Sequence, residues 1–442
     1  MPARSTDSLL QIEESLHSSL KKGHHSASLS DRLISANKRI LLQHIEFRPA
    51  AATSSAQLEK LKSKYASINP STSLTDHVKP SKGMSPFNPP SASDLAHDDD
   101  LPDPKVVLYP PEKVKLQWPA VRRIGAGLTN LGNTCFLNSV LQCLTYTPPL
   151  VNYLSSSEHA HTCKQVGFCM VCELQRHFRR CYENGGQAIK PHAILQKIKL
   201  IAKHMHWGRQ EDAHEFLRYV IDAMQKSCLN GNTKLDRISK ETTVINQIFG
   251  GFLRSQVVCL KCKAKSNTYD PFLDISVDVK NVPNIQKAFE KFVQPEQLDL
   301  DNAYNCTKCK QKVAAQKRFT IHKPSNVLTI QLKRYGVMGG KVTRHISFPE
   351  KLNIRPYMSV SQGAAITYQL YAVLVHMGHS TNSGHYYCYV RSSNQAWYCM
   401  NDSMVQQTSQ GRVLNSEAYM LFYIRCDAAA NHEQPKVCPF HV

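Results

Sequence analysis

The spacing of the hydrophobic residues changes part-way along the chain. After Gln210, apolar residues recur with the spacing of one helix face, at Ala213, Phe216, Leu217, Val220, Ile221 and Met224. Later, short runs rich in β-branched and aromatic residues are separated by loops that contain Gly, Ser and Asn. These runs are Val327–Tyr335, Tyr368–His376, His385–Val390, Ala396–Met400 and Tyr419–Ile424. Helices followed by an antiparallel meander predict an α+β domain.

The N-terminal residues have a different pattern. Residues 1–65 contain short helical patterns between Ser- and His-rich stretches, and residues 70–118 are rich in Pro and Ser. Such a composition cannot bury enough apolar surface to offset the chain entropy. We therefore predict a mostly disordered extension with short helices and a linker over residues 1–118, one folded domain over 119–426 and a disordered tail over 427–442.

The charge of the chain is strongly positive and is concentrated in the predicted domain. The 442 residues carry a net charge of +20, whereas the first 118 residues hold 15 Lys and Arg against 13 Asp and Glu. A basic folded surface attracts polyanions such as RNA, chromatin or acidic proteins. A charge that serves only solubility is the alternative. The hydrophobic fraction of 42% excludes a wholly disordered chain.

The cysteines indicate a reducing compartment. All 15 lie after residue 118, and the N-terminus has no apolar stretch typical of a secretory signal. No run of 18 apolar residues predicts a membrane helix, so no membrane partner is expected. Thiols in such a chain are free, bind metal or act as nucleophiles more often than they form disulfides. We expect the protein in the cytosol or the nucleus.

A candidate nucleophile follows a turn rich in Gly, Asn and Thr. The segment Gly127–Gln142 places Cys135 directly after that turn, and an apolar helical face follows. Thr134 is the predicted N-cap, which puts Cys135 in the first turn of a helix. The positive end of the helix dipole and a nearby imidazolium both stabilise a thiolate. A cysteine in this position also fits a buried apolar residue, so the pattern alone leaves both interpretations open.

A candidate base lies in the strand-rich half. The glycine-bounded loop within Val375–Tyr387 delivers His385 to the start of a strand, and Trp397–Ser403 ends in Asn401 and Asp402. A hairpin would bring one of these two side chains to the far nitrogen of His385 and fix its tautomer.

Two Cys-x-x-Cys pairs form the first candidate metal site. Cys259 and Cys262 make one pair, and Cys306 and Cys309 make the other. Two such knuckles close a tetrahedral tetrathiolate site, which predicts a structural zinc ion. A redox Cys-x-x-Cys motif is the alternative, but it does not explain why there are two pairs.

A second group of candidate ligands lies between the nucleophile and the next helical region. It contains His159, His161, Cys163, Cys169 and Cys172. The spacing allows a ligand set such as His161, Cys163, Cys169 and Cys172 for a second zinc ion, and ordinary reduced thiols are the alternative.

These motifs together carry a family resemblance. Gly127–Gln142 resembles the cysteine box of the ubiquitin-specific proteases, and Tyr371–Val390 with Trp397–Ser403 resembles their histidine box. Gln210–Leu217 and Leu328–Tyr335 also resemble family motifs, in the family's order.

The match extends from residue 123 to about residue 425. A finer resemblance, carried by residues 36–65 and 106–118, is to the branch of ubiquitin carboxyl-terminal hydrolase 36. The resemblance implies a papain-like cysteine protease fold with thumb, palm and zinc-bearing fingers. It also implies no catalytic cofactor.

The resemblance implies the chemistry of the site. Cys135 would attack the carbonyl after the C-terminal Gly-Gly of ubiquitin, with His385 as general base and then general acid. Asn130 and the backbone N–H of Cys135 would stabilise the oxyanion. The residue that orients His385 maps best to Asn401, but Asp402 follows immediately, so this choice stays open.

The resemblance also implies the partners. Gln210, Asp212 and Tyr386 would bind ubiquitin, with Asp212 contacting an arginine of its tail. Ubiquitin and ubiquitylated proteins are the expected partners. RNA, nucleolar or chromatin components are further candidates because of the basic surface, which would place the enzyme in the nucleus, including the nucleolus, as well as the cytosol. A zinc-containing RNA or chromatin adaptor with a protease fold, or a protease for another ubiquitin-like modifier, are the alternatives.

Overall fold

The computed structural model describes residues 101–232, 234–336, 340–380 and 383–426. The predictions for residues 1–100 and 427–442 therefore lie outside the described residues. Within the described part, no helix is long and apolar enough to cross a membrane.

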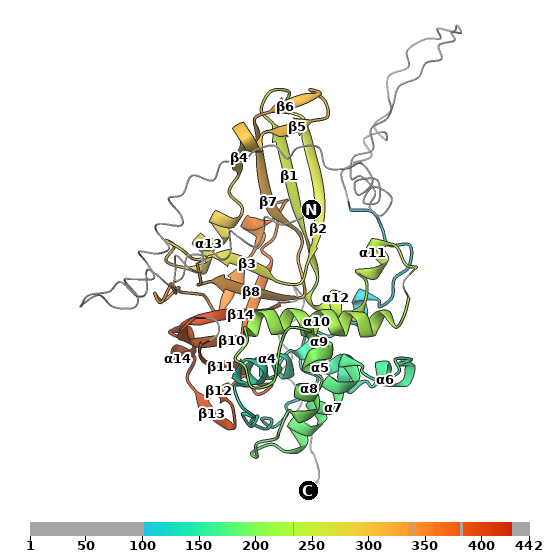
Figure 1. Cartoon of the computed structure of the whole chain (residues 1–442), viewed down its shortest axis with the longest axis vertical. Helices are drawn as coiled ribbons and strands as arrows, with labels where there is room; N and C mark the ends of the chain where they lie inside the picture. Colours follow the sequence, from blue (N-terminus) through green and yellow to red (C-terminus); the bar gives the residue numbers. More distant parts are fainter. Residues whose placement is uncertain (1–100, 233, 337–339, 381–382, 427–442) are drawn as a thin grey trace, which may run out of the picture. The chain divides into compact units, whose positions relative to one another are not determined.

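The first half of the described chain is helical (Figure 1). Its helices are α4 (Cys135–Thr145), α5 (Pro148–Ser155), α6 (Glu158–Thr162), α7 (Met170–Glu183), α8 (His192–Gln196), α9 (Ile198–Ile201), α10 (Ala213–Leu229), α11 (Arg237–Lys240) and α12 (Val244–Phe249). The periodic segment after Gln210 is α10, as predicted. Asp212 caps it, because its side chain accepts a hydrogen bond from the Glu215 N–H.

Helix α4 forms the buried centre of the helical part. All of its residues are buried, and the ring of Phe136 packs edge-on against Phe216 of α10, with 5.4 Å between the centroids. The helix begins at Cys135, and Thr134 occupies the N-cap position as predicted. The Thr134 hydroxyl does not cap the helix, however, because it accepts from the Leu131 N–H at 2.9 Å and so holds the preceding turn.

A four-stranded sheet with the order β2-β1-β7-β4 extends away from the helices. Its strands are β1 (Gly251–Cys259), β2 (Lys265–Phe272), β4 (Glu296–Leu298) and β7 (Ala315–Lys323). A two-stranded sheet, β5 (Tyr304–Cys306) and β6 (Gln311–Val313), lies at its far end (Figure 1).

An eight-stranded sheet forms the centre of the fold. The strand order is β13-β12-β11-β10-β14-β8-β3, and β9 pairs with β10. The strands are β3 (Ile275–Asp278), β8 (Val327–Lys333), β9 (Lys351–Asn353), β10 (Thr367–Ser380), β11 (Ser383–Arg391), β12 (Trp397–Asn401), β13 (Met404–Thr408) and β14 (Ala418–Arg425). The predicted meander is confirmed for β10, β11 and β12, and β13, which was not predicted, extends it. Strand β14 instead returns between β10 and β8, and β3 joins β8 in parallel.

The central sheet separates two hydrophobic cores. On β10, Ala372 and Leu374 belong to the core shared with the helices, whereas Val373 and Val375 belong to a second core. Successive side chains of a strand point to opposite faces, so this strand is buried on both sides. The second core also includes residues of helix α13 (Ile285–Phe292). The remaining described elements are the short helices η1 (Pro111–Lys113), η2 (Leu300–Asn302), η3 (Arg355–Tyr357) and α14 (Gln410–Leu414).

Residues 101–118 pack against the helical part. The Val106 N–H donates to the Ser239 hydroxyl at 3.0 Å, and the Leu108 N–H donates to the Thr242 hydroxyl at 2.9 Å. Leu116 is only 6% exposed. The packed unit therefore includes residues that precede the predicted domain start at 119.

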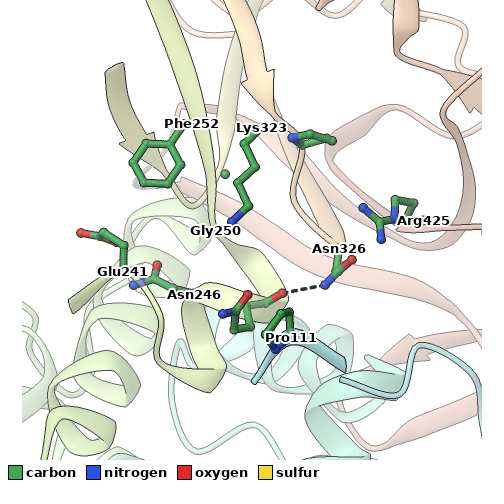
Figure 2. Close-up of a pocket in the computed structure, with 11 residues that line it drawn as sticks. Pro111, Glu241, Asn246, Gly250, Phe252, Lys323, Asn326 and Arg425 are labelled. Atoms are coloured by element: carbon green, nitrogen blue, oxygen red, sulfur yellow. Dashed lines mark hydrogen bonds between the residues drawn. The ribbon is translucent and has the colours of Figure 1, made fainter. Parts of the chain in front are cut away.

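Figure 2 shows where this segment meets the sheets. Pro111 lies with residues of α12, β1, β7 and β14 around a cavity of about 230 Å³. Among the lining residues, the Asn326 amide donates to the Gln247 carbonyl at 2.8 Å. Burial raises the pKa of Glu241, which also lines the cavity. None of the predicted site residues lines it.

We expect Thr242→Val to lower the free energy of unfolding by about 1 kcal/mol, because the Leu108 N–H loses its acceptor in a partly buried contact. Urea unfolding measures this cost. In a chain that begins at residue 119 the same substitution should cost less, since the Leu108 donor is absent. An equal cost in both chains would show that residues 101–118 do not contribute to the packed unit.

Candidate active site

Cys135 and His385 come together although 249 residues separate them. Cys135 is the first residue of α4 and is 1% exposed, and His385 lies near the start of β11. A side-chain hydrogen bond with Cys135 is the largest of the influences that raise the pKa of His385 from 6.5 to about 9. Burial opposes this shift, and a hydrogen bond with Asn401 adds to it. The pair therefore favours an imidazolium beside the sulfur.

The adjacent residues Asn401 and Asp402 point to different partners. His385 Nε2 lies 2.6 Å from Asn401 Oδ1. Because an amide oxygen only accepts, Nε2 carries the hydrogen, and Nδ1 is the nitrogen left to face Cys135. The Asp402 carboxylate instead accepts from the side-chain amides of Asn130 and Asn138, at 3.0 and 2.8 Å.

A tight backbone approach fixes the turn that carries Asp402. Asp402 has a left-handed φ of 47° in the turn between β12 and β13. Its carbonyl accepts from the Leu128 N–H at 2.8 Å. A Cβ on Gly127 would lie 2.2 Å from the Ser403 carbonyl oxygen, so only glycine fits there. The loop before the nucleophile is thereby held against the turn after Asn401.

Asn138 was not among the residues selected from the sequence. It lies one helical turn after Cys135, is 2% exposed and also donates to the Leu128 carbonyl at 3.2 Å. The available signal was an amide side chain within the apolar repeat that follows the nucleophile, since a buried amide needs hydrogen-bond partners.

Gln210 spans the gap between the helices and β11. Its Nε2 lies 4.0 Å from Cys135 Sγ and donates to the Gly384 carbonyl, while its Oε1 accepts from the Gly384 N–H at 3.0 Å. Both the N–H and the carbonyl of Gly384, the residue just before His385, are therefore hydrogen-bonded to the Gln210 side chain.

Asp212 and Tyr386 occupy different environments. Asp212 accepts from the Tyr419 hydroxyl at 2.6 Å and lines a cavity of about 310 Å³ together with Glu215 and Tyr335. Tyr386 is 1% exposed and stacks on His376, with 4.1 Å between the ring centroids. Asp212 is thus open to a ligand in that cavity, and Tyr386 lies beneath the surface.

Two Cys/His tetrads are positioned to bind metal. In the first, Cys259, Cys262, Cys306 and Cys309 place their sulfur atoms within 4.8 Å of one another. Within each knuckle the N–H of the second cysteine donates to the sulfur of the first, at 3.3 and 3.4 Å. This arrangement fits a tetrahedral thiolate site.

The second tetrad consists of His159, Cys163, Cys169 and Cys172. His159 Nε2 lies 3.1 Å from Cys169 Sγ. The predicted set named His161 in place of His159, and that choice was wrong. Two residues along a helix turn the side chain by about 200°, so in α6 His159 is buried toward the cysteines and His161 is exposed.

A family model described as "Ubiquitin carboxyl-terminal hydrolase" matches residues 126–423. The chain belongs to the ubiquitin carboxyl-terminal hydrolase family. This is the family of thiol-dependent deubiquitinating enzymes that its motifs resemble.

Two human relatives in this family are similar over most of the chain. Ubiquitin carboxyl-terminal hydrolase 42 is 51% identical over 83% of this chain, which spans 27% of that relative's length. Ubiquitin carboxyl-terminal hydrolase 17-like protein 6 is 43% identical over 84% of this chain and 92% of its own. This chain thus corresponds to about a quarter of the longer relative.

A solved structure of the SAGA Ubp8/Sgf11/Sus1/Sgf73 DUB module bound to ubiquitin aldehyde has the same fold. It aligns with a TM-score of 0.61 and 33% identity over 69% of this chain and 70% of that chain.

We expect Asn401→Ala to lower the pKa of His385 below about 9, and Cys135→Ala to lower it further, because each removes a partner of the imidazolium. An NMR titration of the His385 ring measures both shifts. The raised pKa means that this pairing stabilises the fold fully below pH 6.5 and that the contribution is lost as the pH rises through about 9. Asn394→Ala, in the same hairpin but exposed, is the control. If the Asn401 variant titrates like the wild type, the hydrogen bond does not support the imidazolium.

Proposed function

We propose that this chain hydrolyses the peptide or isopeptide bond after the C-terminal glycine of ubiquitin. The observation that carries the proposal is the alignment of the Cys135 thiol, the His385 ring and the Asn401 amide in one hydrogen-bonded series. Such a series generates a thiolate and holds the base in one tautomer.

In the proposed acylation step, the Cys135 thiolate attacks the carbonyl carbon of the last glycine. The His385 imidazolium then gives its proton to the leaving lysine amine, and a thioester to Cys135 remains. A water molecule deprotonated by neutral His385 attacks the thioester, which releases the ubiquitin carboxylate and restores the thiolate with its imidazolium.

We assign the orienting role to Asn401 and a different role to Asp402. The Asn130 amide has two hydrogens, of which one is given to Asp402 Oδ2. The other is free to join the Cys135 backbone N–H at an oxyanion. Asp402 would therefore hold the Asn130 amide in the orientation that donates to the oxyanion. Removing the Asn130 donor would lower the rate about 10²–10³-fold.

Ubiquitin binding is supported by the cavity beside Asp212, whose carboxylate would receive an arginine of the tail. Gln210 would keep Gly384 and His385 in place next to that tail. Burial of Tyr386 favours a supporting role under the tail over direct contact.

Within the family, we also propose placement in the branch of ubiquitin carboxyl-terminal hydrolase 36. Only the motifs in residues 36–65 and 106–118 support it, whereas the relatives reported above are hydrolase 42 and a 17-like protein. The basic domain surface further supports RNA, nucleolar or chromatin partners and work in the nucleus, nucleolus and cytosol.

We expect Cys135→Ala to abolish labelling by ubiquitin that carries a C-terminal electrophile, because only the thiolate forms the adduct. Cys143→Ala, a buried cysteine of the same helix, is the matched control and should retain labelling. Gel shifts measure both. Full labelling of the Cys135 variant would refute the assignment, and labelling only by probes of another ubiquitin-like modifier would reassign the substrate.

We further propose that both tetrads hold structural zinc. The donor chemistry supports this metal, since thiolate and imidazole are ligands that zinc prefers. The first ion would join two knuckles that are distant in sequence, whereas the second would cross-link the local segment 159–172. No catalytic step uses either ion.

The two histidines of α6 provide a direct test of the second zinc. Metal analysis of the wild type should find two zinc ions per chain, one for each tetrad. His159→Ala should release one of them at a lower chelator concentration, because a ligand is lost, and His161→Ala should not. Cys262→Ser should release the other ion. A wild type with one zinc that the Cys262 variant loses would disprove the second site.

A further inference from the structure

The two cysteine knuckles of the first tetrad repeat one sequence pattern. Cys259–Lys265 reads Cys-Leu-Lys-Cys-Lys-Ala-Lys, and Cys306–Lys312 reads Cys-Thr-Lys-Cys-Lys-Gln-Lys. The backbone repeats as well, because Lys263 and Lys310, which follow the second cysteine of each knuckle, have left-handed φ angles of 59° and 56°. Each knuckle therefore presents three lysines in equivalent positions.

The repeat gathers six lysines at the far end of the four-stranded sheet. We call this group the knuckle surface, and its members are Lys261, Lys263, Lys265, Lys308, Lys310 and Lys312. Each lies within three residues of a cysteine, so its Cα is within about 11 Å of the Cα of that cysteine, and the four sulfur atoms lie within 4.8 Å of one another. All six are exposed, and Figure 1 shows the knuckles beside β5 and β6 at the far end of the four-stranded sheet.

The knuckle surface is positive and without internal compensation. Within the described chain, none of its six side chains takes part in a hydrogen bond or an ion pair. The segments 256–269 and 302–319 contain no Asp or Glu, although Asp270 follows the first and Asp299 and Asp301 precede the second. Asp270 lies 3.9 Å from Arg237. Two neighbouring cations, unlike these six lysines, have partners within the fold. Lys317 lies over the Phe319 ring, and Arg318 donates to the Val293 carbonyl. A zinc ion with four thiolates would have a net charge of −2, so the six lysines would leave this surface with a net positive charge.

The composition of this surface distinguishes between two kinds of polyanion. A protein interface has an apolar or aromatic centre, but segments 256–269 and 302–319 expose no large hydrophobic side chain, and Leu300 is the nearest one in sequence. Contacts to a phosphate backbone need only cations and no apolar centre. Lysine also lacks the planar fork with which arginine reads guanine.

We propose that the knuckle surface binds the phosphate backbone of a nucleic acid without reading its sequence. This deepens the proposed interaction with RNA or chromatin, and it rests on the proposed zinc that fixes the two knuckles against each other. A bound strand would lie at the far end of the four-stranded sheet and leave Cys135 and His385 free, so the surface would dock the enzyme near its substrates.

Fluorescence anisotropy with a labelled single-stranded RNA of mixed sequence tests the proposal in the full chain. Six phosphate contacts predict a slope of about −4 for log K against log salt. The triple substitution Lys308→Gln, Lys310→Gln, Lys312→Gln should reduce the slope by about 2 and weaken binding about 100-fold at about 0.1 M salt. The same titration with duplex DNA distinguishes an RNA backbone from a DNA backbone as the preferred ligand.

The matched control replaces three exposed lysines of the helical part, Lys197, Lys199 and Lys203, with Gln. An equal loss of affinity in this control would overturn the proposal, because binding would then follow net charge and not the knuckles. Tighter binding to polyglutamate than to either nucleic acid would also overturn it in favour of an acidic protein partner.

A measurement on the wild type covers the case in which the triple variant loses its zinc. RNA should protect the six lysines from reductive methylation, as read by mass spectrometry, and leave Lys197, Lys199 and Lys203 reactive. Unprotected knuckle lysines would refute the site. Failure of ubiquitin labelling would refute the proposed hydrolase and leave this binding result unaffected, so the two failures are distinguishable.

Discussion

The contact between helix α4 and strand β11 is the constraint on which the rest of the site depends. It brings the first residue of a buried helix to the start of a central strand, and so joins Cys135 to His385. The polar side chains of this buried helix each donate at least one hydrogen bond, although the amide oxygens of Asn138 and Gln142 have no partner among the described residues. Ser139 and Thr145 donate to carbonyls of their own helix, and Gln142 donates to the Ala126 carbonyl at 2.9 Å. The last bond also fixes the loop that leads to the nucleophile.

Local patterns predicted the elements well, because they depend on spacing within one segment. The apolar repeat after Gln210 identified α10, and the β-branched runs identified five strands of the central sheet. Pairing between strands depends on residues far apart in the chain. The hydrophobic run of β14 fits any position in a sheet buried on both faces, so its insertion between β8 and β10 was not evident from the sequence.

The candidate site was predictable in its residue types but not in its contacts. Asn401 and Asp402 are neighbours, but Asn401 ends β12 and Asp402 lies in the following turn with a left-handed φ, so the two side chains have different partners. Asn401 reaches His385, whereas Asp402 turns back to Asn130 and Asn138. The choice of His159 over His161 has the same origin, because sequence spacing does not say which face of a short helix points to the cysteines.

The far end of the four-stranded sheet shows why metal and charge belong together. Its hydrophobic cluster contains only Cys259, Cys306 and Val313 as buried members, and β5 and β6 have three residues each. A hairpin of that size is not stable alone in water. Metal ligation would therefore supply the stability that apolar packing supplies elsewhere in the fold. If a metal ion and not a hydrophobic core joins the two knuckles, the residues around the cysteines do not have to be hydrophobic. That freedom is what allows six lysines to occupy the knuckles without a loss of packing.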